Sequence, residues 1–70
     1  MSDGFSQQLK KLRERKRISR RVLADFCQVS KSAMARYERG EQEPTASTIC
    51  RIADYFEVSV DYLLGRTENL

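Results

Sequence analysis

Lys31, Ser32 and Arg36 carry hydrogen-bond donors, and their spacing can place all three on one face of a helix. The apolar residues interleaved with them follow the three- and four-residue spacing of a buried stripe: Ala33, Met34 and Tyr37. Arg can donate two hydrogen bonds to guanine O6 and N7, Lys reaches the same atoms, and Ser pairs with several base edges. Ala35 is small enough to let a helix approach the bases and can touch a thymine methyl group. These residues indicate contacts to base edges, although a merely solvated helix face would explain the pattern, taken alone, equally well.

Contacts to DNA phosphates would come from residues that flank this row. Arg20 and Arg21 fall at the start of an expected helix, where the positive end of the helix favours anions. Hydroxyl and guanidinium groups at neighbouring positions could join them. The expected phosphate contacts are Ser19, Arg20, Arg21, Ser30 and Arg39.

Two short helices, joined by a break at Gln28-Val29-Ser30, must position these side chains. In the first helix three apolar residues share one face: Leu23, Ala24 and Cys27. Ser19 and Ser30 are suitable N-caps, because each hydroxyl can accept from amides of the following turn. Val29 is expected to fill the turn, and Gly40 is suited to end the second helix, which begins at Lys31. This layout is typical of a helix-turn-helix, whose second helix is shaped to enter the DNA major groove.

A further helix is expected before this motif. Phe5, Leu9 and Leu12 follow an i, i+4, i+7 spacing, which indicates an amphipathic helix. The basic run that overlaps it could also be a nuclear-localisation or heparin-binding patch, but the apolar spacing favours the helix.

Two more helices are expected after the motif. Thr45 can cap the first of them, just after Pro44, and its apolar stripe is Ile49, Ile52, Ala53 and Phe56. Ser59 can cap a short last helix, residues 60–64, which Gly65 would end.

The segment LADFCQVSKSAMARYERG (residues 23–40), followed by Pro44 and IADYFEVSVDYLLGRT (residues 52–67), resembles the Cro/phage-repressor (XRE-type) helix-turn-helix family. The family's pattern recurs in order over about residues 6–67. The resemblance implies an all-α fold, a compact five-helix bundle of the lambda-repressor-like type, forming a single domain over residues 1–70. It also implies that the third helix lies in the groove and that Arg13 pairs with Glu38, which pins the first helix to the third.

The chain departs from the family pattern at several turns. The family often has Gly after its first, second and fourth helices, where this chain has Arg17, Gln28 and Glu57. A non-Gly residue in a left-handed cap costs roughly 1 kcal/mol, so either these turns adopt other geometries or stability is lost there. Glu41 and Glu43 follow the third helix and would repel phosphates, so the backbone contacts are expected to be stronger on the side of the first two helices.

Charge is unevenly distributed along the 70 residues. The whole chain carries a net charge of +3, but residues 1–39 hold 11 of the 13 Lys and Arg and 4 of the 10 Asp and Glu. The helix-turn-helix lies in this basic half, and a basic surface attracts phosphate backbones and speeds encounter with them. An ordinary charged surface is the less favoured alternative.

Catalytic, metal and membrane functions receive no support from the sequence. With no His, the usual catalytic triads and zinc-ligand sets are absent, so we expect no enzyme, no metal and no cofactor. Cys27 and Cys50 are each expected to fill an apolar slot as free thiols, with a redox-sensing pair as the alternative. Neither an apolar run long enough for a membrane span nor a signal-peptide pattern is present, which favours a cytoplasmic location.

Self-association is expected near the last helix, because a single recognition helix reads only a few base pairs. Apolar residues exceed what one short helix need bury there, and the expected dimer interface is Val58, Val60, Tyr62, Leu63, Leu64 and Leu70.

The function that these features favour is a dimeric, sequence-specific transcriptional regulator, repressor-like, that reads a palindromic operator in double-stranded DNA. The alternative is an antitoxin-like or anti-repressor module of the same fold that binds a protein partner. Phe26 supports the alternative if it is exposed, although packing at the core's edge is at least as good an explanation.

Overall fold

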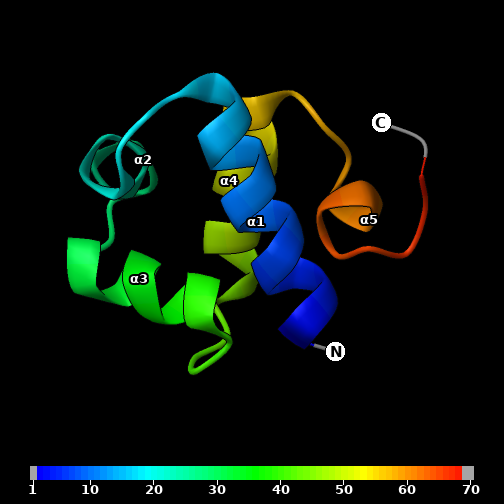
Figure 1. Ribbon diagram of the computed structural model, residues 1–70, viewed down its shortest axis with the longest axis horizontal. Coiled ribbons are helices and arrows are strands. Elements are labelled where there is room, and N and C mark those ends of the chain that lie inside the picture. Colours follow the sequence, from blue (N-terminus) through cyan, green and yellow to red (C-terminus); the bar gives the residue numbers. More distant parts are fainter. Residues whose placement is uncertain (1, 69–70) are drawn as a thin grey trace.

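Each amphipathic segment of the sequence forms a helix in the structure, a computed structural model that describes residues 2–68. Over this range the chain forms five helices and no strand: α1 (Ser2–Lys16), α2 (Arg20–Cys27), α3 (Lys31–Arg39), α4 (Ala46–Phe56) and α5 (Val60–Leu63). In Figure 1, α1 crosses the centre of the view, with α2 and α3 to its left and α5 to its right. The expected all-α, five-helix fold is confirmed, and no helix among the described residues is long and apolar enough to cross a membrane.

Side-chain caps start four of the helices, because the first amides of a helix have no partner within it. Ser19 Oγ accepts from the Val22 amide, and Ser30 Oγ accepts from the Ala33 amide at 2.9 Å. Thr45 and Ser59 do the same for α4 and α5. All four residues were expected as caps from the sequence.

Three helices end on a residue with left-handed backbone that is not glycine. Arg17, Gln28 and Glu57 have φ values of 58°, 62° and 58°. Gly40, which ends α3, has a φ of 74°. The chain therefore keeps the left-handed cap geometry and accepts the steric cost of a Cβ there, about 1 kcal/mol at each position.

A single core joins all five helices. Its fully buried side chains are Leu9, Leu23, Cys27, Met34, Ile52 and Leu63. Arg51 links α4 to the end of α2, since its Nη1 donates to the Cys27 carbonyl at 3.3 Å. This core fixes α3 against α1 and α2 and holds its outer face towards solvent.

Two sequence expectations about burial are wrong. Leu63 is 0% exposed, because α5 turns it into the core between α1 and α4, so Leu63 cannot belong to a dimer interface. Cys50 is exposed rather than in an apolar slot, because the neighbouring residues of α4 that face inward are Ile52 and Ala53. Leu70 lies outside the described residues.

Candidate nucleic-acid interface

The α2–turn–α3 unit is built as the sequence indicates. Gln28 ends α2, and the amide of Val29 donates to the Ala24 carbonyl at 3.0 Å. The Val29 side chain is half-buried and packs against the core. Ser30 then caps α3, whose outer side lies at the left and lower edge of the molecule in Figure 1.

The outward side of α3 carries the residues expected to contact bases. Its inward side is buried and consists of Ala33, Met34, Tyr37 and Glu38. Lys31 and Ser32 are exposed, whereas Ala35 and Arg36 are half-buried. The structure thus brings these four together on one face, with short side chains between long basic ones.

The loop after Gly40 contacts both arginines at the end of α3. Arg36 Nε donates to Gln42 Oε1 at 2.7 Å. Arg39 Nε and Nη2 donate to the two carboxylate oxygens of Glu41 at 3.0 and 3.1 Å. The hydrogen bond from Arg39 lowers the pKa of the exposed Glu41 carboxyl below its ordinary value. Sequence reasoning treated Glu41 only as a repulsive charge and missed Gln42, since no spacing rule predicts a contact across an irregular loop.

A buried carboxylate connects α1, α2 and α3. Glu38, whose side chain is 2% exposed, accepts from Arg13 Nε at 2.5 Å and from Arg13 Nη2 at 3.2 Å. Arg13 Nη1 also donates to the Ile18 carbonyl at 3.0 Å. The hydrogen bond with Glu38 raises the pKa of the Arg13 guanidinium. The ion pair that the family resemblance implied is present, and it ties α3 to α1.

Arg20 has a second task that the sequence did not reveal. Its Nε donates to Glu38 Oε1 at 3.0 Å, while its side chain remains 40% exposed. Arg21 beside it is exposed. The remaining expected phosphate contacts, Ser19 and Ser30, use their oxygens to cap helices but keep a hydroxyl proton to donate. Arg20 and Arg21 therefore differ in their surroundings, since Arg20 is bonded to Glu38 and Arg21 is exposed.

Two large apolar side chains are exposed on α2. Val22 and Phe26 are 46% and 50% exposed and lie one turn apart. The Phe26 ring also contacts Tyr55 of α4 edge to face, with ring centroids 5.0 Å apart. Both explanations of Phe26 thus hold in part: it packs at the edge of the core and it presents apolar surface.

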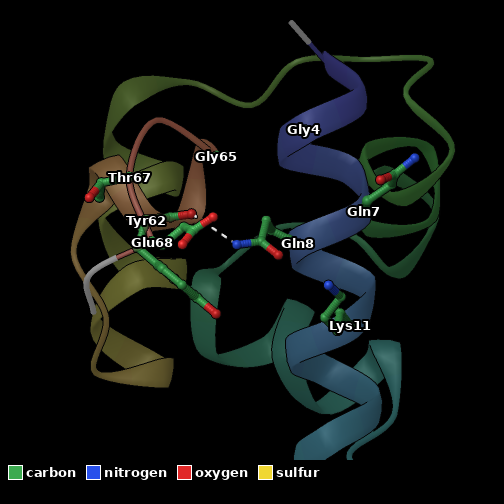
Figure 2. Close-up of a pocket in the computed structure, with 8 residues that line it drawn as sticks. All are labelled: Gly4, Gln7, Gln8, Lys11, Tyr62, Gly65, Thr67 and Glu68. Atoms are coloured by element: carbon green, nitrogen blue, oxygen red, sulfur yellow. Dashed lines mark hydrogen bonds between the residues drawn. The ribbon is translucent and has the colours of Figure 1, made fainter.

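A shallow pocket of about 430 Å³ lies on the other side of α1, between its first turns and the segment after α5. Figure 2 shows the Gln8 side chain of α1 pointing towards Tyr62 and Glu68 across the pocket, which Lys11 and Thr67 also line. Gln8 Nε2 donates to the Tyr62 carbonyl at 3.2 Å, which ties the two walls together. This pocket is remote from the outward side of α3.

The cysteines do not form a ligand set. Cys27 is buried, and burial raises the pKa of its thiol, whereas Cys50 is exposed. Within residues 2–68 no group of three or more Cys, Asp and Glu side chains could hold a metal ion.

The unit of α2 and α3 has a capped start to each helix and a row of donors on α3, and the Arg13–Glu38 ion pair joins it to α1. These features define a helix-turn-helix domain, a class of DNA-binding rather than catalytic modules. A family model described as "Helix-turn-helix domain" matches residues 5–63. The chain belongs to the Cro/phage-repressor (XRE-type) helix-turn-helix family, as its sequence motifs indicated.

Curated relatives carry matching names. The chain is 37% identical over 65 residues to "Uncharacterized HTH-type transcriptional regulator YqaE" of Bacillus subtilis, covering 93% of this chain and 56% of the relative. It is 37% identical over 61 residues to "HTH-type transcriptional regulator AnsR" of the same organism, covering 87% and 53%. Over 44 residues it is 41% identical to "Cryptic phage CTXphi transcriptional repressor RstR" of Vibrio cholerae, covering 63% and 39%. The chain thus spans about half the length of the first two relatives, and no solved structure matches it at a significant level.

Proposed function

We propose that this chain binds double-stranded DNA in a sequence-specific manner, as a repressor-like transcriptional regulator that inserts α3 into the major groove. The observation that carries the proposal is the row of Lys31, Ser32, Ala35 and Arg36 on a helix whose opposite side is buried and braced by Glu38. Such a row can reach base edges, and the buried brace keeps it at a fixed angle. The names of the curated relatives agree with this role.

The proposed phosphate contacts surround that row. Arg21 and the exposed part of Arg20 supply charge at the start of α2, with Ser19 beside them. Ser30 and Arg39 flank α3 on either end. Arg39 is the weakest of these contacts, because the Glu41 carboxylate already accepts from it and would itself be repelled by phosphates. The proposed phosphate contacts are therefore strongest on the α2 side.

Binding as a two-fold dimer would allow two copies of α3 to read a palindromic operator, with half-sites about 34 Å apart. Val58, Val60, Tyr62 and Leu64 are all partly exposed around α5. The adjoining pocket holds Lys11 and Glu68, which carry opposite charges. In a two-fold interface residue i of one copy contacts residue j of the other, and j contacts i, so Lys11 of each copy would pair with Glu68 of the other.

The test of DNA binding begins with selection of bound duplexes from a random pool. Affinity for the selected duplex and for a random duplex is then measured over a range of salt concentrations. We expect a strong preference for the selected duplex and a linear fall of log affinity with log salt concentration. Arg36→Ala should lower affinity for the selected duplex by about 1 to 3 kcal/mol and relax preference at one base position. Equal loss for all duplexes would remove the base-reading role.

The test of dimerisation is sedimentation at high protein concentration, with and without the selected duplex. We expect weak self-association that strengthens on a palindromic duplex, and Tyr62→Ala should weaken it. One copy per duplex at saturation would contradict the dimer while leaving DNA binding in place.

The exposed pair Val22 and Phe26 favours a second candidate function, a protein-interaction module of antitoxin or anti-repressor type. The two functions differ in their dependence on DNA. A chain that folds but shows no salt-dependent shift with any selected duplex would support the protein-interaction function instead.

A further inference from the structure

Arg36 and Arg39 lie one turn apart at the end of α3, and the following loop holds both through Nε. Gln42 accepts one hydrogen bond from Arg36, at 2.7 Å. Glu41 accepts two from Arg39, at 3.0 and 3.1 Å. A neutral amide therefore holds the first arginine, whereas a carboxylate holds the second.

The contact with Gln42 leaves Arg36 one way to bind a base with two hydrogen bonds. A guanidinium can present either Nε with one Nη or its two Nη groups, and it has no acceptor, so the amide oxygen of Gln42 must face it. Because Gln42 occupies Nε, the two Nη groups at the tip remain. Paired N–H donors of this kind match O6 and N7 of guanine. The hydrogen bond from half-buried Arg36 to Gln42 also forms without DNA, and a side chain held in advance loses less entropy on binding.

Arg39 is placed in the opposite situation. Its Nε and one Nη are both occupied by the Glu41 carboxylate, which also balances its charge. Its side chain and that of Glu41 are 55% and 54% exposed, so phosphates near this pair would meet a carboxylate as well as a guanidinium. Gln42, being uncharged, orients Arg36 without balancing its charge.

We propose that Gln42 is a positioning residue that determines specificity, by directing the two Nη groups of Arg36 at a guanine in the major groove. Glu41, which lies in the same loop, occupies Nε and one Nη of Arg39 and so keeps Arg39 from binding a base. This inference rests on the proposed function, because α3 has to lie in the groove for Arg36 to meet a base. It adds a residue outside the helix-turn-helix to the determinants of the operator sequence.

The experiment uses the duplex selected by the unaltered protein, all its single base-pair variants, and a random duplex. Arg36→Ala identifies the base pair that Arg36 reads, which we expect to be G·C. Gln42→Ala should then reduce discrimination at that base pair by about three- to tenfold, part of the full effect of a bidentate contact. Discrimination elsewhere and affinity for the random duplex should stay within about twofold. Combining Gln42→Ala with Arg36→Ala should add nothing to Arg36→Ala alone.

Glu41→Ala is the matched variant in the same loop. It removes a carboxylate and releases Arg39, so it should raise affinity for every duplex alike and leave base preference unchanged. Thermal unfolding checks that each variant is folded. Because Glu41 and Gln42 are exposed, we expect both variants to fold.

Three results would overturn the inference. Gln42→Ala could weaken all duplexes equally, it could act just as strongly in the Arg36→Ala protein, or the base pair read by Arg36 could lack guanine. Failure of the unaltered protein to prefer any duplex is a different result, because it overturns the proposed function before any Gln42 variant is made.

Discussion

Replacing Glu38 with Gln tests how far the recognition helix depends on the buried ion pair. The change keeps the size of the side chain but removes the charge that accepts three hydrogen bonds from Arg13 and Arg20. The Arg13 guanidinium, with its side chain only 12% exposed, would lose its carboxylate partner. Breaking a buried pair from one side costs about 3 to 5 kcal/mol.

Two features of the structure reduce that figure. Arg13 keeps a hydrogen bond to the Ile18 carbonyl at 3.0 Å, and Arg20 is exposed enough to return to water. We therefore expect Glu38→Gln to lower the free energy of unfolding by about 2 to 3 kcal/mol, a large part of the roughly 5 to 15 kcal/mol of a small domain. Arg20→Ala should cost about 1 kcal/mol or less, because its contact is partly solvated.

The assay is urea unfolding followed by circular dichroism at the helical wavelength. With a slope of about 1 kcal/mol per molar urea, Glu38→Gln should move the midpoint down by roughly 2 to 3 M. Glu41→Gln is the matched control, since Glu41 also accepts from an arginine but at the surface, and its midpoint should not move measurably. Equal, small shifts for the two variants would refute the reasoning, because burial would then confer no special dependence on the carboxylate.

Four further predictions concern the caps, the thiols and the start of α2. Glu57→Gly should raise the free energy of unfolding by about 1 kcal/mol because it relieves a left-handed residue, whereas Glu57→Ala, which keeps the Cβ, should not; urea midpoints compare them. At neutral pH an alkylating reagent should label exposed Cys50 in the folded protein and buried Cys27 only after unfolding, as mass spectrometry can count. Burial raises the pKa of Cys27 above 9.0, so the stability that its neutral thiol contributes is complete below pH 9.0 and is lost as pH rises through the folded-state value. Urea midpoints should therefore fall over that pH range, and they should fall less steeply with pH in Cys27→Ala. Arg21→Ala should lower the salt slope of DNA binding by about 1, and Arg20→Ala by less, because Arg20 is shared with Glu38; equal slopes would contradict this division.

The sequence determined the helices, their caps and the outward row of α3. Helix periodicity and capping are local, so the spacing of Ala33, Met34 and Tyr37 suffices to show which side of α3 is buried. Ser30 and Gly40 likewise mark its ends, because their side chain and backbone act within one turn. The pairing of Arg13 with Glu38 came from the family resemblance, since no local rule joins residues so far apart along the chain.

The tertiary structure alone decided how the charged and apolar residues at the edges are used. Leu63 is in the core because other helices cover it, and Cys50 is exposed because no other helix among the described residues covers it. Arg20 is partly committed to Glu38 because the fold brings the start of α2 beside the end of α3. The contact of Gln42 with Arg36 depends on the path of an irregular loop, whose hydrogen bonds follow from its exact backbone and not from any repeat in the sequence.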